Sequence, residues 1–84
     1  MSLETLVSAV AAILTTLAFV PQALHIIRHK ETRAISLQMY VVFAIGVAFW
    51  LAFGVMIWNW PMIVANTITL ALAVAILAMK LRYG

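Results

Sequence analysis

Phe19-Val20-Pro21-Gln22 places a proline and an amide deep inside the first of three long apolar runs. Because proline has no N–H and its ring pushes on the carbonyl one turn earlier, a helix that passes through Pro21 loses its bond to Leu17 and bends. In hydrocarbon, polar side chains, neighbouring helices or water must satisfy such a gap. The polar side chains near enough to help are Thr15, Thr16 and Gln22. Two interpretations stay open: a static kink, which is common in membrane helices, and a hinge for a moving half-helix.

Apolar residues dominate the whole chain. Of its 84 residues, 68% are hydrophobic and 8% are charged, which separates it from soluble domains. Residues 5–27, 37–58 and 61–79 form three runs without Asp, Glu, Lys or Arg, each near the ~20 residues that cross hydrocarbon. The first run lacks a basic flank and a convincing cleavage site, so we expect a retained helix and not a signal peptide. The sequence predicts an all-α membrane protein whose single domain, residues 1–84, is a bundle of three transmembrane helices.

The basic residues are distributed asymmetrically. Arg28, Lys30 and Arg33 follow the first run, Lys80 and Arg82 follow the third, and the short second connection carries no charge. By the positive-inside rule, the N-terminus is outside and the C-terminus is cytoplasmic, in the cell inner (plasma) membrane. Membrane topology explains these cations, so we expect no nucleic-acid partner.

Residues that could perform chemistry are scarce. The chain has no cysteine, which excludes thiolate chemistry and Cys-based metal sites. His25 and His29 could share one helical face, but two ligands without a third are weak evidence for a metal, and we expect an interfacial, partly solvated pair. No nucleophile stands with a base and an orienting group, so we expect no enzyme and no cofactor. No run contains a carboxylate, which argues against coupling to protons.

Trp50 and Asn66 stand out as candidate binding residues. Trp50 lies eight residues before Trp58 in the sequence, so at ~1.5 Å per residue it is about 12 Å below the outer interface. Asn66 is roughly 7.5 Å below the same surface by the same rise. One interpretation is a packing tryptophan and an interhelical amide. The other is a pocket for a neutral polyhydroxy ligand, with an apolar ring and a convergent amide.

Small and capping residues predict local structure. Ser2 and Ser36 are suited to cap the first and second helices. Ala44, Ala48 and Ala52 recur every four residues and predict close helix packing. Ala65, Thr69 and Ala73 do the same in the third run.

The tetrad of residues 19–22, the loop of residues 30–40, Trp50 and Asn66 together resemble the bacterial SemiSWEET sugar transporters of the PQ-loop superfamily. The resemblance covers essentially the whole chain. It implies a triple-helix protomer, with two protomers packed in parallel around a central sugar pathway. It further implies that Pro21–Gln22 is the hinge, and that Trp50 and Asn66 contact the sugar.

The same resemblance suggests residues that could close the transport pathway at its inner and outer ends. Many bacterial relatives carry Tyr, Arg and Asp near the outer end of the second helix, where this chain has Phe53, Ile57 and Asn59. We therefore expect an outer gate without an ion pair. The inner gate candidates are Met39, Tyr40 and Phe43, and the outer gate candidates are Phe53 and Ile57. Phe19 is a further gate candidate.

These predictions converge on a facilitative sugar transporter that moves a neutral mono- or disaccharide by alternating access. Three helices cannot enclose a sugar-sized path, whereas a parallel homodimer can. One alternative is a non-transporting membrane assembly subunit, in which Pro21 and Asn66 are structural. Another is a PQ-loop carrier of a cationic amino acid or other metabolite, which is expected to use a buried acidic residue that this chain lacks.

Overall fold

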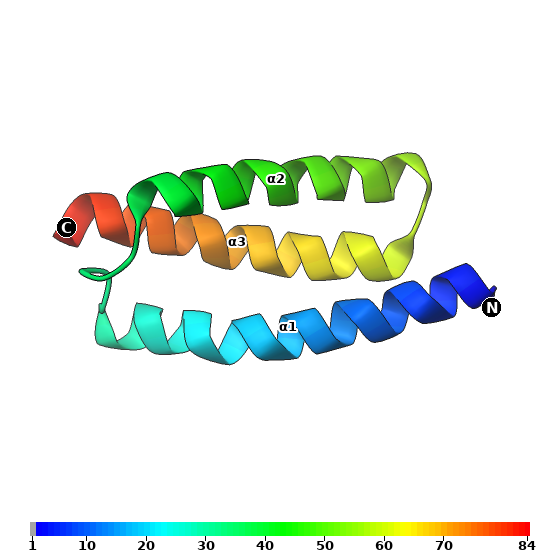
Figure 1. The fold of residues 1–84 in the computed structure, drawn as a ribbon, viewed down its shortest axis with the longest axis horizontal. Helices are drawn as coiled ribbons and strands as arrows, with labels where there is room; N and C mark the ends of the chain where they lie inside the picture. The colour runs from blue at the N-terminus through cyan, green and yellow to red at the C-terminus, as the bar shows by residue number, and fades with distance from the viewer. Residues whose placement is uncertain (1) are drawn as a thin grey trace.

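The computed structural model describes residues 2–84, which form three helices and no strand. Helix α1 spans Leu3–His29, α2 spans Leu37–Met56 and α3 spans Trp60–Tyr83. Consecutive helices run in opposite directions, so the start of the chain and the α2–α3 turn share one end of the molecule (Figure 1). The C-terminus and the α1–α2 loop share the other end. The predicted all-α, three-helix fold is confirmed.

Helix α3 is the central element. It packs against both α1 and α2, and Figure 1 shows α3 between them. The buried apolar core is correspondingly small and consists of Ala23, Ala44, Val47, Ala73 and Ile76.

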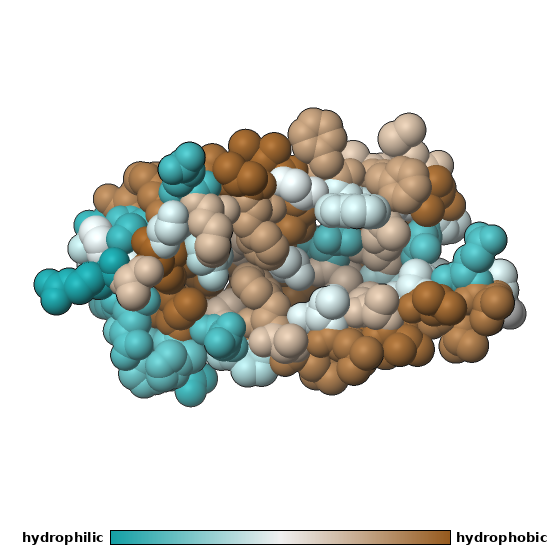
Figure 2. Space-filling view, viewed as in Figure 1, coloured by the Kyte–Doolittle hydropathy of each residue, from teal (hydrophilic) through white to brown (hydrophobic). Residues whose placement is uncertain are grey.

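Large apolar side chains cover the outside of all three helices. Phe49 is 74% exposed and Met56 is 82% exposed. Figure 2 shows apolar residues along the length of the molecule and hydrophilic residues mainly towards its ends. All three helices are long and apolar enough to cross a membrane. The long dimension, 44 Å, is close to the ~40–45 Å of a bilayer with its headgroups. The chain is a membrane protein, because soluble proteins rarely expose so large a continuous apolar surface to water.

The helix ends follow local sequence signals. The Ser2 hydroxyl accepts a bond from the Thr5 N–H at 3.1 Å, and the Ser36 hydroxyl accepts one from the Met39 N–H at 3.2 Å, so both predicted caps are confirmed. Helix α2 ends before its apolar run does, because Trp58 adopts a positive φ of 54° that turns the chain into α3.

The predicted stripe of small residues in α2 packs only in part. Ala44 is buried, whereas Ala48 and Ala52 are exposed. Gly54 is buried against α3, where an added Cβ would lie 3.2 Å from the Met62 side chain. Close approach of α2 and α3 therefore depends on Ala44 and Gly54.

Helix α1 continues through Pro21 as one gently bowed element (Figure 1). The expectation that nearby side chains satisfy the Leu17 carbonyl is wrong for residues 2–84. The Thr15 hydroxyl donates to Ala11 O at 2.9 Å, and the Thr16 hydroxyl is buried without a partner. The reason is geometric, since a helical threonine reaches back to carbonyls three or four positions earlier and Leu17 follows both threonines. Gln22 is exposed.

The end of α3 holds the α1–α2 loop. The Lys80 ammonium donates to Thr32 O at 3.0 Å and to Arg33 O at 3.3 Å. The Thr32 hydroxyl donates to Gly84 O at 3.3 Å, and Thr32 is only 1% exposed. These contacts fasten the loop to the last turn of α3.

Candidate functional site

An open cavity of about 400 Å³ has walls from all three helices. It brings together Trp50 of α2 and Asn66 of α3, the two candidate binding residues. Its full lining is Ser8, Ala11, Ala12, Thr15, Trp50, Met62, Ala65, Asn66 and Thr69. The cavity contains no charged side chain.

Asn66 is partly buried, and only part of its hydrogen-bonding capacity is used. Its Nδ2 donates to Met62 O, one turn earlier in α3, at 2.8 Å. This bond fixes the side chain and leaves Oδ1 without a donor from residues 2–84. An amide oxygen with free lone pairs in a half-buried site suits a hydroxyl donor.

Trp50 presents a large apolar surface that its own chain leaves uncovered. The residue is 59% exposed. The Phe53 ring meets it edge-on, with centroids 6.0 Å apart and an interplanar angle of 78°. Gly46, Phe49 and Phe53 form a further open hollow beside the indole. The ring can therefore stack against a ligand or a second copy of the chain.

Three hydroxyl residues of the cavity, Ser8, Thr15 and Thr69, were not among the site residues predicted from the sequence. The Ser8 hydroxyl donates to Thr5 O at 2.9 Å, and that of Thr15 donates to Ala11 O. Because their protons are engaged, both oxygens are left mainly as acceptors. Helical spacing was the available signal, since Ser8 and Thr15 are two turns apart on one face of α1.

Three gate candidates, Phe19, Tyr40 and Phe43, form an aromatic cluster that spans α1 and α2. The Phe19 and Phe43 rings have centroids 5.8 Å apart, and those of Tyr40 and Phe43 are 6.0 Å apart. Met39 is 56% exposed on the same end of α2. Their role as a gate stays a prediction.

At the end where the sequence predicts the outer gate, residues 2–84 form hydrogen bonds and no ion pair. Asn59 Oδ1 accepts from the Ser8 hydroxyl and from the Met62 N–H, each at 3.2 Å. This oxygen caps α3 and also ties α1 to the turn between α2 and α3. Of the outer candidates, Phe53 touches Trp50, and Ile57 is the exposed C-cap of α2.

The histidine pair lies at the other end of the molecule. The two ring centroids are 4.2 Å apart, and His29 Nδ1 is 3.0 Å from His25 O. The His25 side chain is 57% exposed and lies 3.6 Å from a Glu31 oxygen. No group of three potential metal ligands occurs in the described part of the chain.

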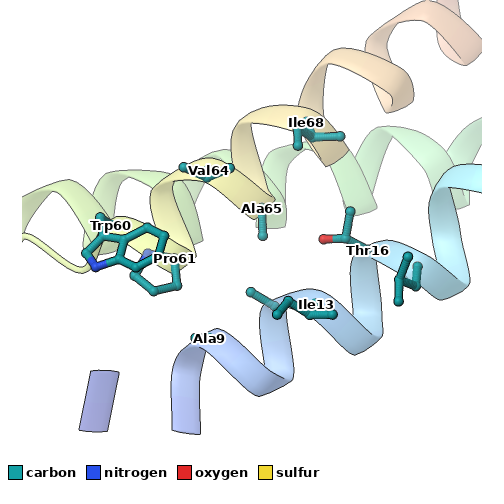
Figure 3. Close-up of a pocket in the computed structure, with 10 residues that line it drawn as sticks. Ala9, Ile13, Thr16, Trp60, Pro61, Val64, Ala65 and Ile68 are labelled. Atoms are coloured by element: carbon teal, nitrogen blue, oxygen red, sulfur yellow. The ribbon is translucent and has the colours of Figure 1, made fainter. Parts of the chain in front are cut away.

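A second cavity, of about 260 Å³, lies between α1 and α3 (Figure 3). Ile13 and Val64 are typical of its lining, whose polar side-chain groups are the Thr16 hydroxyl and the Trp60 indole N–H. Most sugar hydroxyls would lose their bonds to water there without replacement, which costs several kcal/mol per group. The cavity at Trp50 and Asn66 is therefore the better site for a polyhydroxy ligand.

A family model described as PQ loop repeat matches residues 3–59. The chain belongs to the SemiSWEET family of PQ-loop proteins. It is 43% identical to the "Sugar transporter SemiSWEET" of Leptospira biflexa, over 98% of this chain and 96% of that protein. It is 42% identical to the protein of the same name from Bradyrhizobium diazoefficiens, over 94% of this chain and 92% of the relative.

Solved SemiSWEET structures have the same fold. A bacterial homologue of SWEET transporters matches with a TM-score of 0.81 and 43% identity, over 99% of this chain and 100% of that one. SemiSWEET in the inward-open conformation matches with a TM-score of 0.89 and 39% identity, over 98% of this chain and 88% of that one. The predicted family is confirmed, and the SemiSWEET relatives are named as transporters and not as enzymes.

Proposed function

We propose that the chain is a facilitative sugar transporter, in which two copies move a neutral mono- or disaccharide across the inner membrane by alternating access. We place the N-terminus outside and the C-terminus in the cytoplasm. The observation that carries the proposal is the uncharged cavity that combines the open face of Trp50 with the amide of Asn66. The names of the SemiSWEET relatives support sugar as the substrate class.

The chemistry of the cavity suits this substrate. A sugar has an apolar C–H face that stacks on an indole and hydroxyls that pair with amide and hydroxyl groups. Net gains of ~1 kcal/mol per neutral hydrogen bond let a ligand bind and leave again. A charged partner, by contrast, would hold the substrate or require a counter-ion. No charged side chain lines the cavity.

A second copy completes the site in this proposal. The cavity is open in one chain, and the uncovered Trp50 face continues over Phe49 and Phe53. At 100° per residue, Ala48 and Ala52 face away from Trp50, so we assign the close contact to Gly46 and not to these alanines. A twofold axis along the membrane normal would place two Trp50 rings and two Asn66 amides around one path.

Gly46→Leu tests the dimer. An added Cβ at Gly46 meets no atom within 4 Å in the protomer, so the three-helix fold should survive. Leucine there should instead obstruct the partner. Native mass spectrometry from nanodiscs should show dimers for the unmodified chain and mainly monomers for Gly46→Leu. Ala71→Leu, at an exposed position of α3, is the matched control and should remain dimeric. A monomer that transports sugar would contradict the proposal.

Uptake of a panel of labelled sugars into proteoliposomes tests the transport function. Sugar should enter until its concentrations are equal and then stop, because the apolar runs of residues 5–27, 37–58 and 61–79 contain no carboxylate that could carry a coupling proton. An imposed pH difference or membrane potential should not produce accumulation. Accumulation would contradict facilitated diffusion and make His25→Gln the next variant to measure. If no sugar or other solute moved, the assembly-subunit alternative would be favoured.

A further inference from the structure

The end of the molecule that holds the α1–α2 loop carries every Lys and Arg of the chain. Figure 2 shows hydrophilic residues gathered at this end. Lys80 is engaged by the loop carbonyls, and Glu31 lies beside His25. Within residues 2–84, no carboxylate forms an ion pair with the remaining cations, which are Arg28, Lys30, Arg33 and Arg82.

Two of these cations converge on one ring. Lys30 Nζ is 5.3 Å from the centroid of Tyr83, and Arg82 Cζ is 5.7 Å from the same centroid. Both distances are within the ~6 Å at which a cation interacts with an aromatic face. Neither cation has a carboxylate partner within residues 2–84, so an anion beside Tyr83 would be attracted by both charges.

The fold prearranges this pair. Lys30 is the left-handed C-cap of α1, with φ 55° and its N–H bonded to Ile26 O. Arg82 and Tyr83 belong to the last turn of α3. Because Lys80 fastens the intervening loop to α3, the ends of the two helices are held as one unit.

We propose that Lys30, Arg82 and Tyr83 bind the phosphate of an anionic membrane phospholipid. The guanidinium offers a planar pair of donors to phosphate oxygens and the ammonium offers a point charge. The tyrosine ring, 49% exposed, is of the kind that lies at headgroup level. The acyl chains of the lipid would lie along the exposed apolar surfaces of α1 and α3. The source is a lipid and not free phosphate, because the three residues lie at the ends of membrane-length helices and therefore at headgroup depth.

Lipid retention measures this site independently of transport. The chain is released into mild detergent from nanodiscs that contain equal amounts of phosphatidylglycerol and phosphatidylcholine with identical acyl chains, and bound lipid is counted by native mass spectrometry. The unmodified chain should retain phosphatidylglycerol preferentially. The double variant Lys30→Gln/Arg82→Gln should lose about thirtyfold in phosphatidylglycerol affinity, as expected for the removal of two cations at a membrane surface.

Three further arms make the result decisive. Arg28→Gln/Arg33→Gln removes the same charge from the same end and should reduce affinity much less, because neither residue belongs to the proposed site. Tyr83→Leu keeps every charge and should still weaken retention. Inorganic phosphate at millimolar concentration should not displace the lipid. Equal losses in the two double variants would show diffuse attraction and overturn the site, and displacement by inorganic phosphate would overturn the lipid as its ligand.

Discussion

Trp50→Ala should remove most sugar transport and leave the protein folded in the membrane. The side chain is 59% exposed in the protomer and belongs to no part of the buried core, so its removal leaves little protein surface unpacked. In the proposed dimer, the same change removes the apolar plane on which the sugar stacks. Asn66→Ala should also weaken sugar binding, because the sugar hydroxyls then lose their hydrogen bond to the free amide oxygen.

The expected size of both effects follows from the cost of an unpaired polar group. Losing a partner in a half-buried site costs ~1–3 kcal/mol, which weakens sugar binding by roughly one to two decades. Calorimetry on the purified variants measures the affinity, and uptake into proteoliposomes measures the transport. Expression and helix content should match those of the unmodified chain.

Two control variants separate the Trp50 and Asn66 cavity from the rest of the molecule. Trp60→Ala changes a tryptophan that lines the apolar cavity between α1 and α3 (Figure 3). Thr67→Ala changes the polar residue after Asn66, whose exposed hydroxyl donates to Ile63 O at 2.6 Å. Both should bind and transport sugar almost normally. If Trp60→Ala lost binding while Trp50→Ala kept it, the sugar site would lie in the α1–α3 cavity instead.

The sequence was sufficient to predict the three helices and the similar levels of Trp50 and Asn66 along them. Long uncharged runs force helices in hydrocarbon, and the constant rise of a helix puts Trp50 and Asn66 at similar levels. The structure then places both on one cavity.

The sequence did not predict which side of each helix faces its neighbours. Nearly uniform apolar runs offer no polar face from which to read it, so the cavity positions of Ser8 and Thr69 were missed. The same lack left the orientations of Ala48 and Ala52 open, and both proved to be exposed. Hydrogen bonds between residues far apart in sequence, such as that from Lys80 to Thr32 O, also depend on which helices are neighbours. No local sequence pattern specifies those neighbours.

Pro21→Ala is the variant that separates movement from binding. In the proposed mechanism, the cytoplasmic half of α1 swings about Pro21 while the outer end of α2 closes over the sugar. Pro21 is exposed and lies outside the Trp50 and Asn66 cavity, so its side chain has no direct part in sugar contact. It is, however, close in sequence to Phe19, whose ring meets Phe43 of α2. A bend at Pro21 would therefore move one side of this aromatic cluster relative to the other.

Alanine at position 21 would supply the N–H that proline lacks and close the bond to Leu17 O. Each swing would then have to break or strain a bond worth ~1 kcal/mol or more, so exchange between inward and outward states should slow by roughly tenfold. Sugar affinity should change much less, because the cavity residues are untouched. Counterflow in liposomes and calorimetry on the same preparation measure the two quantities together. Pro61→Ala is the control, since Pro61 is in the first turn of α3 and its missing N–H breaks no helical bond. Normal counterflow in Pro21→Ala would show a static kink, whereas slow counterflow with preserved affinity is expected only of a hinge.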